Sequence, residues 1–247
     1  PTRMQTALGI VLSTASKAQP AGVFGSFGWS GEAIDLLEGK LKDGGYSLAF
    51  EPIRVKFKPT DVTLKYCEEV GTDFAQALKK AKRAKQPRTP ASSVEQAVGR
   101  IVGSLCIVTA RQGEVSSAML ASWVSQASFA PPGFTVAVAK DRASDVPLSR
   151  GRGFVLDILA EGRHLSPMKH FLKPFAPGED RFANVDTEVA ENGAPILTDA
   201  IAYLECTVAQ RMECGDHWLV YATVEAGRVL DGEGKTAVHY RNTGTHY

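Results

Sequence analysis

The chain has 247 residues, of which 44% are hydrophobic and 22% are charged, and its formal net charge is +1. This balance is ordinary for a globular protein with a buried core, and it gives no electrostatic reason to expect nucleic acid or an anionic membrane as a partner. No apolar run approaches the roughly 20 residues that a membrane-spanning helix needs, so we expect no membrane insertion.

The first part of the chain alternates strand and helix patterns. In chain order we expect a strand at 21–24, a glycine-rich turn at 25–31, a helix at 32–43, a strand at 53–57 and a long helix that starts at Pro59–Thr60. In the first of these helices Ile34, Leu37 and Leu41 share one face, and Gly44–Gly45 supplies the stop. Strands joined through helices indicate α/β architecture.

A basic segment then interrupts this pattern. Six Lys and Arg residues lie between Lys79 and Arg88, together with alanines and prolines. Basic residues suit the carboxyl end of a helix, and Pro beside Ser or Thr marks a boundary, so a helix end that passes into a linker is favoured over a nucleic-acid-binding arm. We therefore predict a first domain at 1–84, a linker at 85–97 and a second domain at 98–247.

The second domain has the texture of a β protein. We expect strands at 101–109, 115–119, 135–139, 154–159, 202–208 and 218–224, and short helices near Asp145–Ser149 and Ser166–Phe171. Many short strands with Gly and Pro between them indicate a barrel or a sandwich.

The four cysteines, Cys67, Cys106, Cys206 and Cys214, form no CxxC pair, which favours free thiols in a reducing compartment. Cys206, Cys214 and His217 have neither the spacing nor the ligand count of a closed zinc site, so we expect no metal in this chain.

The stretch Ser116–Pro132 is rich in small and hydroxyl-bearing residues and ends in a double proline. Small residues let backbone N–H groups approach a flat ring, and hydroxyls donate hydrogen bonds to phosphate, so a loop of this kind suits an aromatic cofactor with a phosphate tail. Composition alone also allows a polar surface loop.

This loop resembles the cofactor loop of the flavin reductase family, and further motifs of the family follow in order. They are Phe154–Leu159 with Asp157 at the usual Asn position, Asp180-Arg181-Phe182, Pro195-Ile196-Leu197, Leu204-Glu205-Cys206, Gly215-Asp216-His217 and His239-Tyr240-Arg241. The resemblance implies a split β-barrel, usually a homodimer with FMN at or near the subunit interface.

Site residues follow from the resemblance. Ala121, Ser122, Trp123 and Val124 would line the isoalloxazine ring, next to Leu120, Ser125 and Gln126. Ser117, Ser128 and Lys140 would take the ribityl-phosphate end, with Arg142 as a further cation, and Tyr240 and Arg241 would close over the cofactor. His217 is the candidate catalytic residue beside the flavin or the nicotinamide, although a histidine that Asp216 merely caps is an equal alternative. NADH or NADPH would bind in an open groove, because no GxGxxG motif follows a strand.

The first domain resembles part of another flavoprotein. Phe24–Ala33 and Glu51–Thr60 are similar to the flavodoxin-like domain of flavodiiron proteins, so 1–84 would be its second half, in which Ser26, Phe27, Gly28 and Trp29 contact a second FMN. The start without methionine indicates a fragment of a longer protein.

Flavodiiron proteins with a C-terminal flavin reductase domain belong to oxygenic phototrophs. The resemblance implies electron transfer from NAD(P)H, or another photosynthetic donor such as ferredoxin, through both flavins to a diiron site that lies outside this chain and reduces oxygen to water. It also implies a homodimer, or a hetero-oligomer with a related flavodiiron protein, in cyanobacterial cytoplasm or chloroplast stroma. Two alternatives stay open: a non-catalytic flavin-binding or oligomerisation module, and a reductase that supplies reduced flavin to a separate oxygenase.

Overall fold

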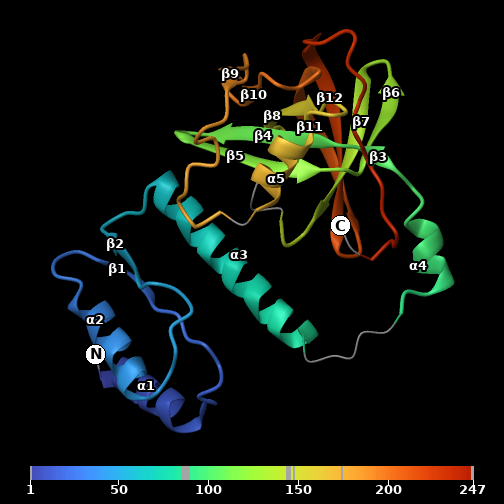
Figure 1. Ribbon diagram of the computed structural model, residues 1–247. Coiled ribbons are helices and arrows are strands. Elements are labelled where there is room, and N and C mark those ends of the chain that lie inside the picture. Colours follow the sequence, from blue (N-terminus) through green and yellow to red (C-terminus); the bar gives the residue numbers. More distant parts are fainter. Residues whose placement is uncertain (1, 85–89, 143–145, 147, 174, 246–247) are drawn as a thin grey trace. The chain divides into compact units, whose positions relative to one another are not determined.

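The computed structural model describes residues 2–84, 90–142, 146, 148–173 and 175–245 (Figure 1). The chain forms two compact units, 1–79 and 80–247, and each is described by itself.

The first unit is a small α/β arrangement. Its elements are α1 (Thr2–Thr14), β1 (Phe24–Phe27), α2 (Glu32–Asp43), β2 (Ile53–Lys56) and α3 (Asp61–Ala84), the last of which continues past residue 79. Strands β1 and β2 pair in parallel, with Phe24 opposite Ile53. The buried residues Val23, Ile34, Leu41 and Tyr46 form the core. Strand β1 starts three residues later than predicted, because Ala21 makes only an isolated bridge to Leu48.

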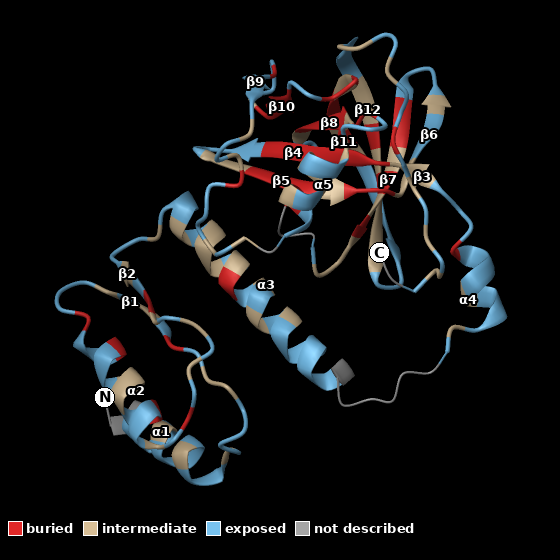
Figure 2. Ribbon diagram, viewed as in Figure 1, coloured by how far each residue is buried: buried red, intermediate tan, exposed pale blue. Residues whose placement is uncertain are grey.

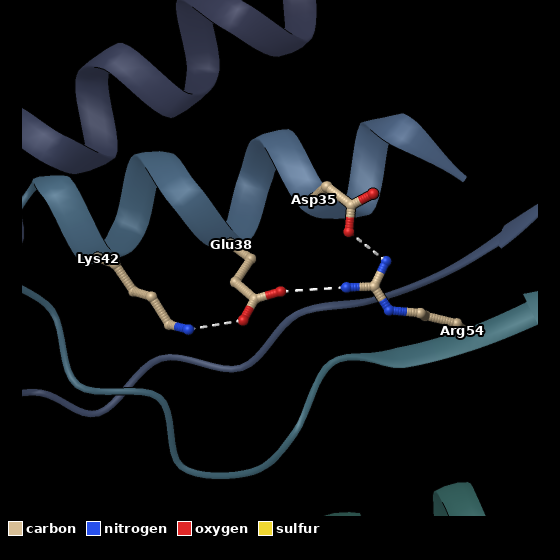
Figure 3. Close-up of polar contacts among 4 residues, drawn as sticks. All are labelled: Asp35, Glu38, Lys42 and Arg54. Carbon is tan, nitrogen blue, oxygen red and sulfur yellow. Dashed lines mark hydrogen bonds and ion pairs between the residues drawn. The ribbon is translucent and has the colours of Figure 1, made fainter. Parts of the chain in front are cut away.

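An ion-pair network joins helix α2 to strand β2 (Figure 3). Arg54 contacts Asp35 at 2.5 Å and Glu38 at 3.1 Å, and Glu38 also contacts Lys42 at 2.7 Å. Asp35 and Glu38 both face β2 because they lie three residues apart on the helix. Three of the four side chains are exposed and only Glu38 is largely covered, so the network orients the helix more than it stabilises the unit.

The second unit is built on one large antiparallel sheet. In chain order its elements are α4 (Ser93–Val98), β3 (Gly103–Ser104), β4 (Cys106–Gln112), β5 (Val115–Ala121), β6 (Val124–Phe129), β7 (Pro132–Ala139), β8 (Gly153–Ile158), α5 (Leu165–Leu172), β9 (Thr187–Val189), β10 (Pro195–Leu197), β11 (Ala202–Cys214), β12 (His217–Val229) and β13 (Val238–His239). Seven strands pair in the order β5-β4-β8-β11-β12-β7-β6, and the pairs β9–β10 and β3–β13 are separate.

The two edge strands of this sheet, β5 and β6, are consecutive in the chain and only Ser122 and Trp123 separate them. The sheet must therefore curl until its edges meet at this corner, and register shifts in β11 and β6 help it to bend. The result is an incompletely closed antiparallel barrel, which is consistent with the predicted split β-barrel.

Two main apolar clusters fill this unit beside a smaller one that includes Val155 and Ile196, and Figure 2 shows buried residues along β4, β5 and β7. One cluster includes Val136, Phe154, Val208 and Val220 of the sheet. The other places Phe171 of helix α5 against Ile107 and Leu159. The alternation of buried and accessible residues along β7 explains why this strand could be predicted.

The structure bears on three expectations from the sequence. The stretch Ser116–Pro132 is largely not a loop, because it forms most of β5, all of β6 and the start of β7, and only the corner at Ser122–Trp123 and the turn at Ala130–Pro131 leave the ladders. The helix predicted at Ser166–Phe171 is confirmed as α5, whereas the one near Asp145–Ser149 falls largely outside the described residues. The predicted linker 85–97 contains most of a short helix, α4. A capping box between Ser92 and Glu95 fixes the start of this helix.

Candidate functional site

The corner at Ser122–Trp123 gathers the groups that could hold a flat ligand. The carbonyl of Trp123 accepts a hydrogen bond from the Ala137 amide at 3.0 Å, which ties the corner to β7. Gly103 of β3 lies directly against the corner, since a Cβ built there would be 1.9 Å from the Ser122 carbonyl oxygen. A residue without a side chain is therefore required at position 103.

An aromatic stack covers the corner. The His217 ring lies 4.7 Å from the Trp123 ring, centroid to centroid, with 26° between their planes. Nδ1 of His217 is 2.7 Å from a carboxylate oxygen of Asp216, and this hydrogen bond is the main cause that lowers the pKa of Asp216. The His217 side chain is 12% exposed and that of Asp216 is 93% exposed. Asp216 can thus orient the imidazole from the solvent side.

The C-terminal segment brings a cation to the same place. The guanidinium carbon of Arg241 lies 4.7 Å from the centre of the Trp123 ring. Its Nη2 donates to the Ile101 carbonyl at 3.4 Å. The segment is held on both sides of Arg241, by the pairing of β13 with β3 and by a 2.6 Å hydrogen bond from the Gly244 amide to the Glu95 carbonyl.

The residues predicted to line the flavin ring fall into two groups, with buried and with exposed side chains. The side chain of Ala121 is buried in the first core cluster, Val124 packs against that cluster, and Leu120 packs against the second. Only the backbone of Ala121 is thus available to a ligand. Ser122 is buried at the corner, whereas Ser125 and Gln126 are exposed on the edge strand β6.

The predicted phosphate-binding residues do not come together. Ser128 pairs with Gly133, and Lys140 follows the other end of β7, seven residues away. At about 3.3 Å per residue this is roughly 23 Å, so the two side chains cannot hold one phosphate group. Ser117 is buried within β5, and Lys140 already pairs with Glu213.

Two further predicted residues, Arg142 and Tyr240, each follow the end of a strand. The Arg142 amide donates to the Ala139 carbonyl at 2.9 Å, which places Arg142 just after β7. Tyr240 is exposed and follows β13 directly, between His239 and Arg241. Tyr240 therefore points away from the buried side of this segment.

Sequence reasoning missed two residues of this region, Gly103 and His239, and the burial of Asp157 in β8. Gly103 looks like an ordinary strand glycine, and His239 was noted only as part of a motif. Asp157 was read as a variant of the motif, yet it is completely buried, and burial raises the pKa of its carboxyl group well above the usual value. A charged residue within a strand pattern was the one available signal for Asp157.

The first unit presents exposed aromatic rings at the carboxyl ends of its two parallel strands. Trp29, just after β1, is 90% exposed, and Phe57, just after β2, is 62% exposed. The Phe57 amide donates to the Phe27 carbonyl at 2.8 Å, which extends the pairing to this edge, and Gly28 lies against the Phe57 ring. Ser26 belongs to β1 itself. Ligands of α/β sheets bind at this end of the strands.

Cys67, Cys106, Cys206 and Cys214 are all free thiols, as predicted. Burial raises the pKa of the Cys106 thiol to about 12, so this thiol is inert near neutrality. The described residues contain no group of three or more His, Cys, Asp or Glu side chains that could hold a metal ion. No helix among them is sufficiently long and apolar to cross a membrane.

Comparison with known proteins identifies the second unit. Residues 98–246 match the flavin reductase-like domain family. The chain belongs to that family. Over its whole length it is also similar to cyanobacterial diflavin flavoproteins: it is 68% identical to diflavin flavoprotein A 6 of Nostoc sp., of which it spans 43%, and 54% identical to diflavin flavoprotein A 1 of Synechocystis sp., again spanning 43% of that protein. The predicted resemblance to the C-terminal part of a flavodiiron protein of an oxygenic phototroph is therefore confirmed.

Solved structures support the fold of the flavin reductase-like domain. The NADH:FAD oxidoreductase SgcE6 of Streptomyces globisporus has a TM-score of 0.55 and 24% identity, and the match covers 64% of this chain and 95% of that protein. The styrene monooxygenase flavin reductase of Pseudomonas putida S12 has a TM-score of 0.51 and 21% identity, over 60% of this chain and 93% of that protein. The part of this chain that each structure matches is similar in length to the second unit.

Proposed function

We propose that the flavin reductase-like domain binds FMN at the Ser122–Trp123 corner and serves as an NAD(P)H:flavin oxidoreductase. The observation that carries this proposal is the stack of His217, Trp123 and Arg241 at the one corner where the edges of the sheet meet. Membership of the family supports the flavin, and the choice of NADH or NADPH as donor is part of the proposal.

The corner suits a flavin in two respects. The aromatic pair offers a flat apolar surface against which a tricyclic ring can stack. Nδ1 of His239 and Nη1 of Arg241 are buried and have no hydrogen-bond partner in the described part of the chain, so the site offers donors to the oxygen atoms of a bound cofactor. When bound, FMN supplies the acceptor for the two electrons of a reduced nicotinamide.

The residues of the chain would then position the reactants. His217, oriented by Asp216, would limit how the nicotinamide approaches, and Trp123 would exclude water from the ring face.

The experiment that tests this function has two stages. The purified chain is first titrated with FMN, and the loaded protein is then mixed with NADH or NADPH without oxygen while flavin absorbance is followed. We expect saturable binding and rapid bleaching with at least one donor. Failure to bind FMN would refute the proposal. Binding without bleaching by either donor would favour the non-catalytic module instead.

For the longer protein, we extend the proposal to a second flavin in a flavodoxin-like domain and to a diiron site that reduces oxygen to water. The exposed Trp29 and Phe57 at one end of the β1–β2 pair, and the similarity to diflavin flavoproteins, support the second flavin. In the full-length protein Trp29→Ala should lower the flavin content by about one FMN per chain, whereas Trp123→Ala should remove the other. Equal flavin content in wild type and Trp29→Ala would contradict this assignment.

A further inference from the structure

Two buried nitrogen atoms near the corner have no hydrogen-bond partner in the described part of the chain. They are Nδ1 of His239 and Nη1 of Arg241. A buried donor without a partner is destabilising, and side chains that can turn toward water normally do so. Two such atoms on neighbouring side chains indicate a place that a ligand completes.

The backbone brings the two side chains to the same face. His239 pairs with Gly103 across the β3–β13 ladder, and Arg241 lies two residues further on. Gly103 in turn abuts the Ser122 carbonyl. The pKa of His239 is lowered mainly by burial and secondly by the positive charge of Arg241. The imidazole and the guanidinium group therefore lie within electrostatic range of each other. Both therefore face the corner at which Trp123 lies.

The fold fixes Arg241 before any ligand arrives. Its guanidinium group lies over Trp123 and donates weakly to Ile101. Beyond it the chain packs closely on α4, since a Cβ at Gly99 would be 2.6 Å from the Thr243 amide nitrogen and one at Gly244 would be 2.6 Å from a methyl carbon of Val98. An arginine held in this way loses little side-chain entropy on binding.

The charge of this pair is not balanced by the protein. Among the described residues no carboxylate forms an ion pair with Arg241 or His239, and the nearby Asp216 bonds His217. A planar cation with a free N–H and an imidazole whose Nδ1 can donate match a group with several acceptor oxygens and a negative charge.

We propose that His239 and Arg241 bind a phosphate group of the nucleotide ligand at this corner. The inference rests on the function proposed above, and it moves the phosphate subsite away from Ser128 and Lys140, which lie at opposite ends of β7. The phosphate belongs either to FMN, as its 5′-phosphate, or to the nicotinamide dinucleotide, as its pyrophosphate. Both present the same oxygen acceptors.

The test compares ligands with and without phosphate. Dissociation constants for FMN and riboflavin, and KM values for NADH and reduced nicotinamide riboside at saturating flavin, are measured for wild type, Arg241→Gln and His239→Gln. Arg111→Gln is the matched control, because Arg111 is exposed and its Nε bonds only the Gly113 carbonyl. Far-ultraviolet circular dichroism verifies that each variant is folded.

We expect Arg241→Gln to weaken one phosphate-bearing ligand at least about tenfold, as the loss of one charge-assisted hydrogen bond predicts, and to leave its phosphate-free counterpart unchanged. His239→Gln should act on the same ligand to a smaller extent. A change confined to FMN against riboflavin assigns the flavin phosphate, and a change confined to NADH against the riboside assigns the pyrophosphate.

Two results would overturn the inference while leaving the proposed function intact. One is equal weakening of the phosphate-bearing and phosphate-free ligands, which would mean that the pair contacts a ring. The other is an unchanged affinity in both folded variants. Wild-type protein that binds no flavin would instead refute the proposed function, so the two failures are distinguishable.

Discussion

The imidazole of His217 stacks on the indole of Trp123, with ring centroids 4.7 Å apart and planes inclined by 26°. The contact joins His217, the first residue of β12, to the corner between β5 and β6. Strands β5, β6 and β12 meet there only because the sheet curls. A planar ligand that stacks at this corner meets both rings. Their relative position is therefore the geometry on which the proposed reaction depends.

Replacing His217 should separate binding from turnover. His217→Ala removes the ring that limits nicotinamide approach but leaves Trp123 and the corner backbone, so we expect flavin reduction to be at least about tenfold slower and FMN affinity to fall by a smaller factor. Asp216→Asn keeps the imidazole and can still bond it, so its effect should be smaller. Anaerobic stopped-flow reduction measures both variants, and an unchanged rate in His217→Ala would show that the histidine is only structural.

The strands of the barrel could be predicted because their buried residues are apolar over several positions, as in Cys106–Val108 and Phe154–Leu156. The cofactor stretch was misjudged for a related reason. Ser125 and Gln126 look like loop residues, yet an edge strand with one open side tolerates polar side chains on its exposed faces.

The candidate site was only partly predictable. Motif resemblance located Trp123, His217 and Arg241, but no local pattern reveals that residues more than 90 positions apart stack together. Equally, the separation of Ser128 from Lys140 follows from strand pairing, and the requirement for Gly103 follows from a backbone approach between β3 and the corner. These relationships depend on topology, which composition and spacing do not contain.

Gly103→Ala should damage the corner directly. The new Cβ would lie 1.9 Å from the Ser122 carbonyl oxygen, so the backbone of β3 or the corner must move. We expect FMN binding to weaken at least about tenfold and the unfolding free energy to fall by about 1 to 3 kcal/mol. Gly232→Ala is the control, because a Cβ there meets nothing within 4 Å. Similar flavin affinity in the two variants would show that the corner does not contact the cofactor.

The Arg54 ion-pair network should contribute less to the unfolding free energy than the buried core of the first unit. Arg54→Gln removes exposed ion pairs to Asp35 and Glu38, so the expected loss is below about 1 kcal/mol and smaller at high salt. Ile34→Ala empties a buried site and should cost about 2 to 4 kcal/mol at any salt concentration. Urea unfolding at two ionic strengths measures both. A larger, salt-independent loss in Arg54→Gln would indicate that the arginine packs as part of the core.

Asp157 should make the second unit less stable as the pH rises. Its Oδ1 accepts a hydrogen bond from the Leu197 amide at 3.0 Å, and its buried Oδ2 has no partner among the described residues. Burial raises the pKa of the folded-state carboxyl group well above that of the unfolded chain, so the folded protein retains a proton that the unfolded chain releases. The stabilisation from this group is complete below the unfolded-state pKa and is lost progressively as the pH rises toward the folded-state value.

Asp157→Asn removes this dependence, because the amide stays neutral and its oxygen can still accept from Leu197. We expect the variant to exceed wild type by at least about 1 kcal/mol at pH 8, or roughly 3 °C in the unfolding midpoint, and by much less at pH 4. Asp199→Asn, at an exposed position, controls for the loss of a charge. Thermal unfolding across this pH range decides the matter: if the difference between wild type and Asp157→Asn does not grow with pH, the carboxyl group is not held protonated by the fold.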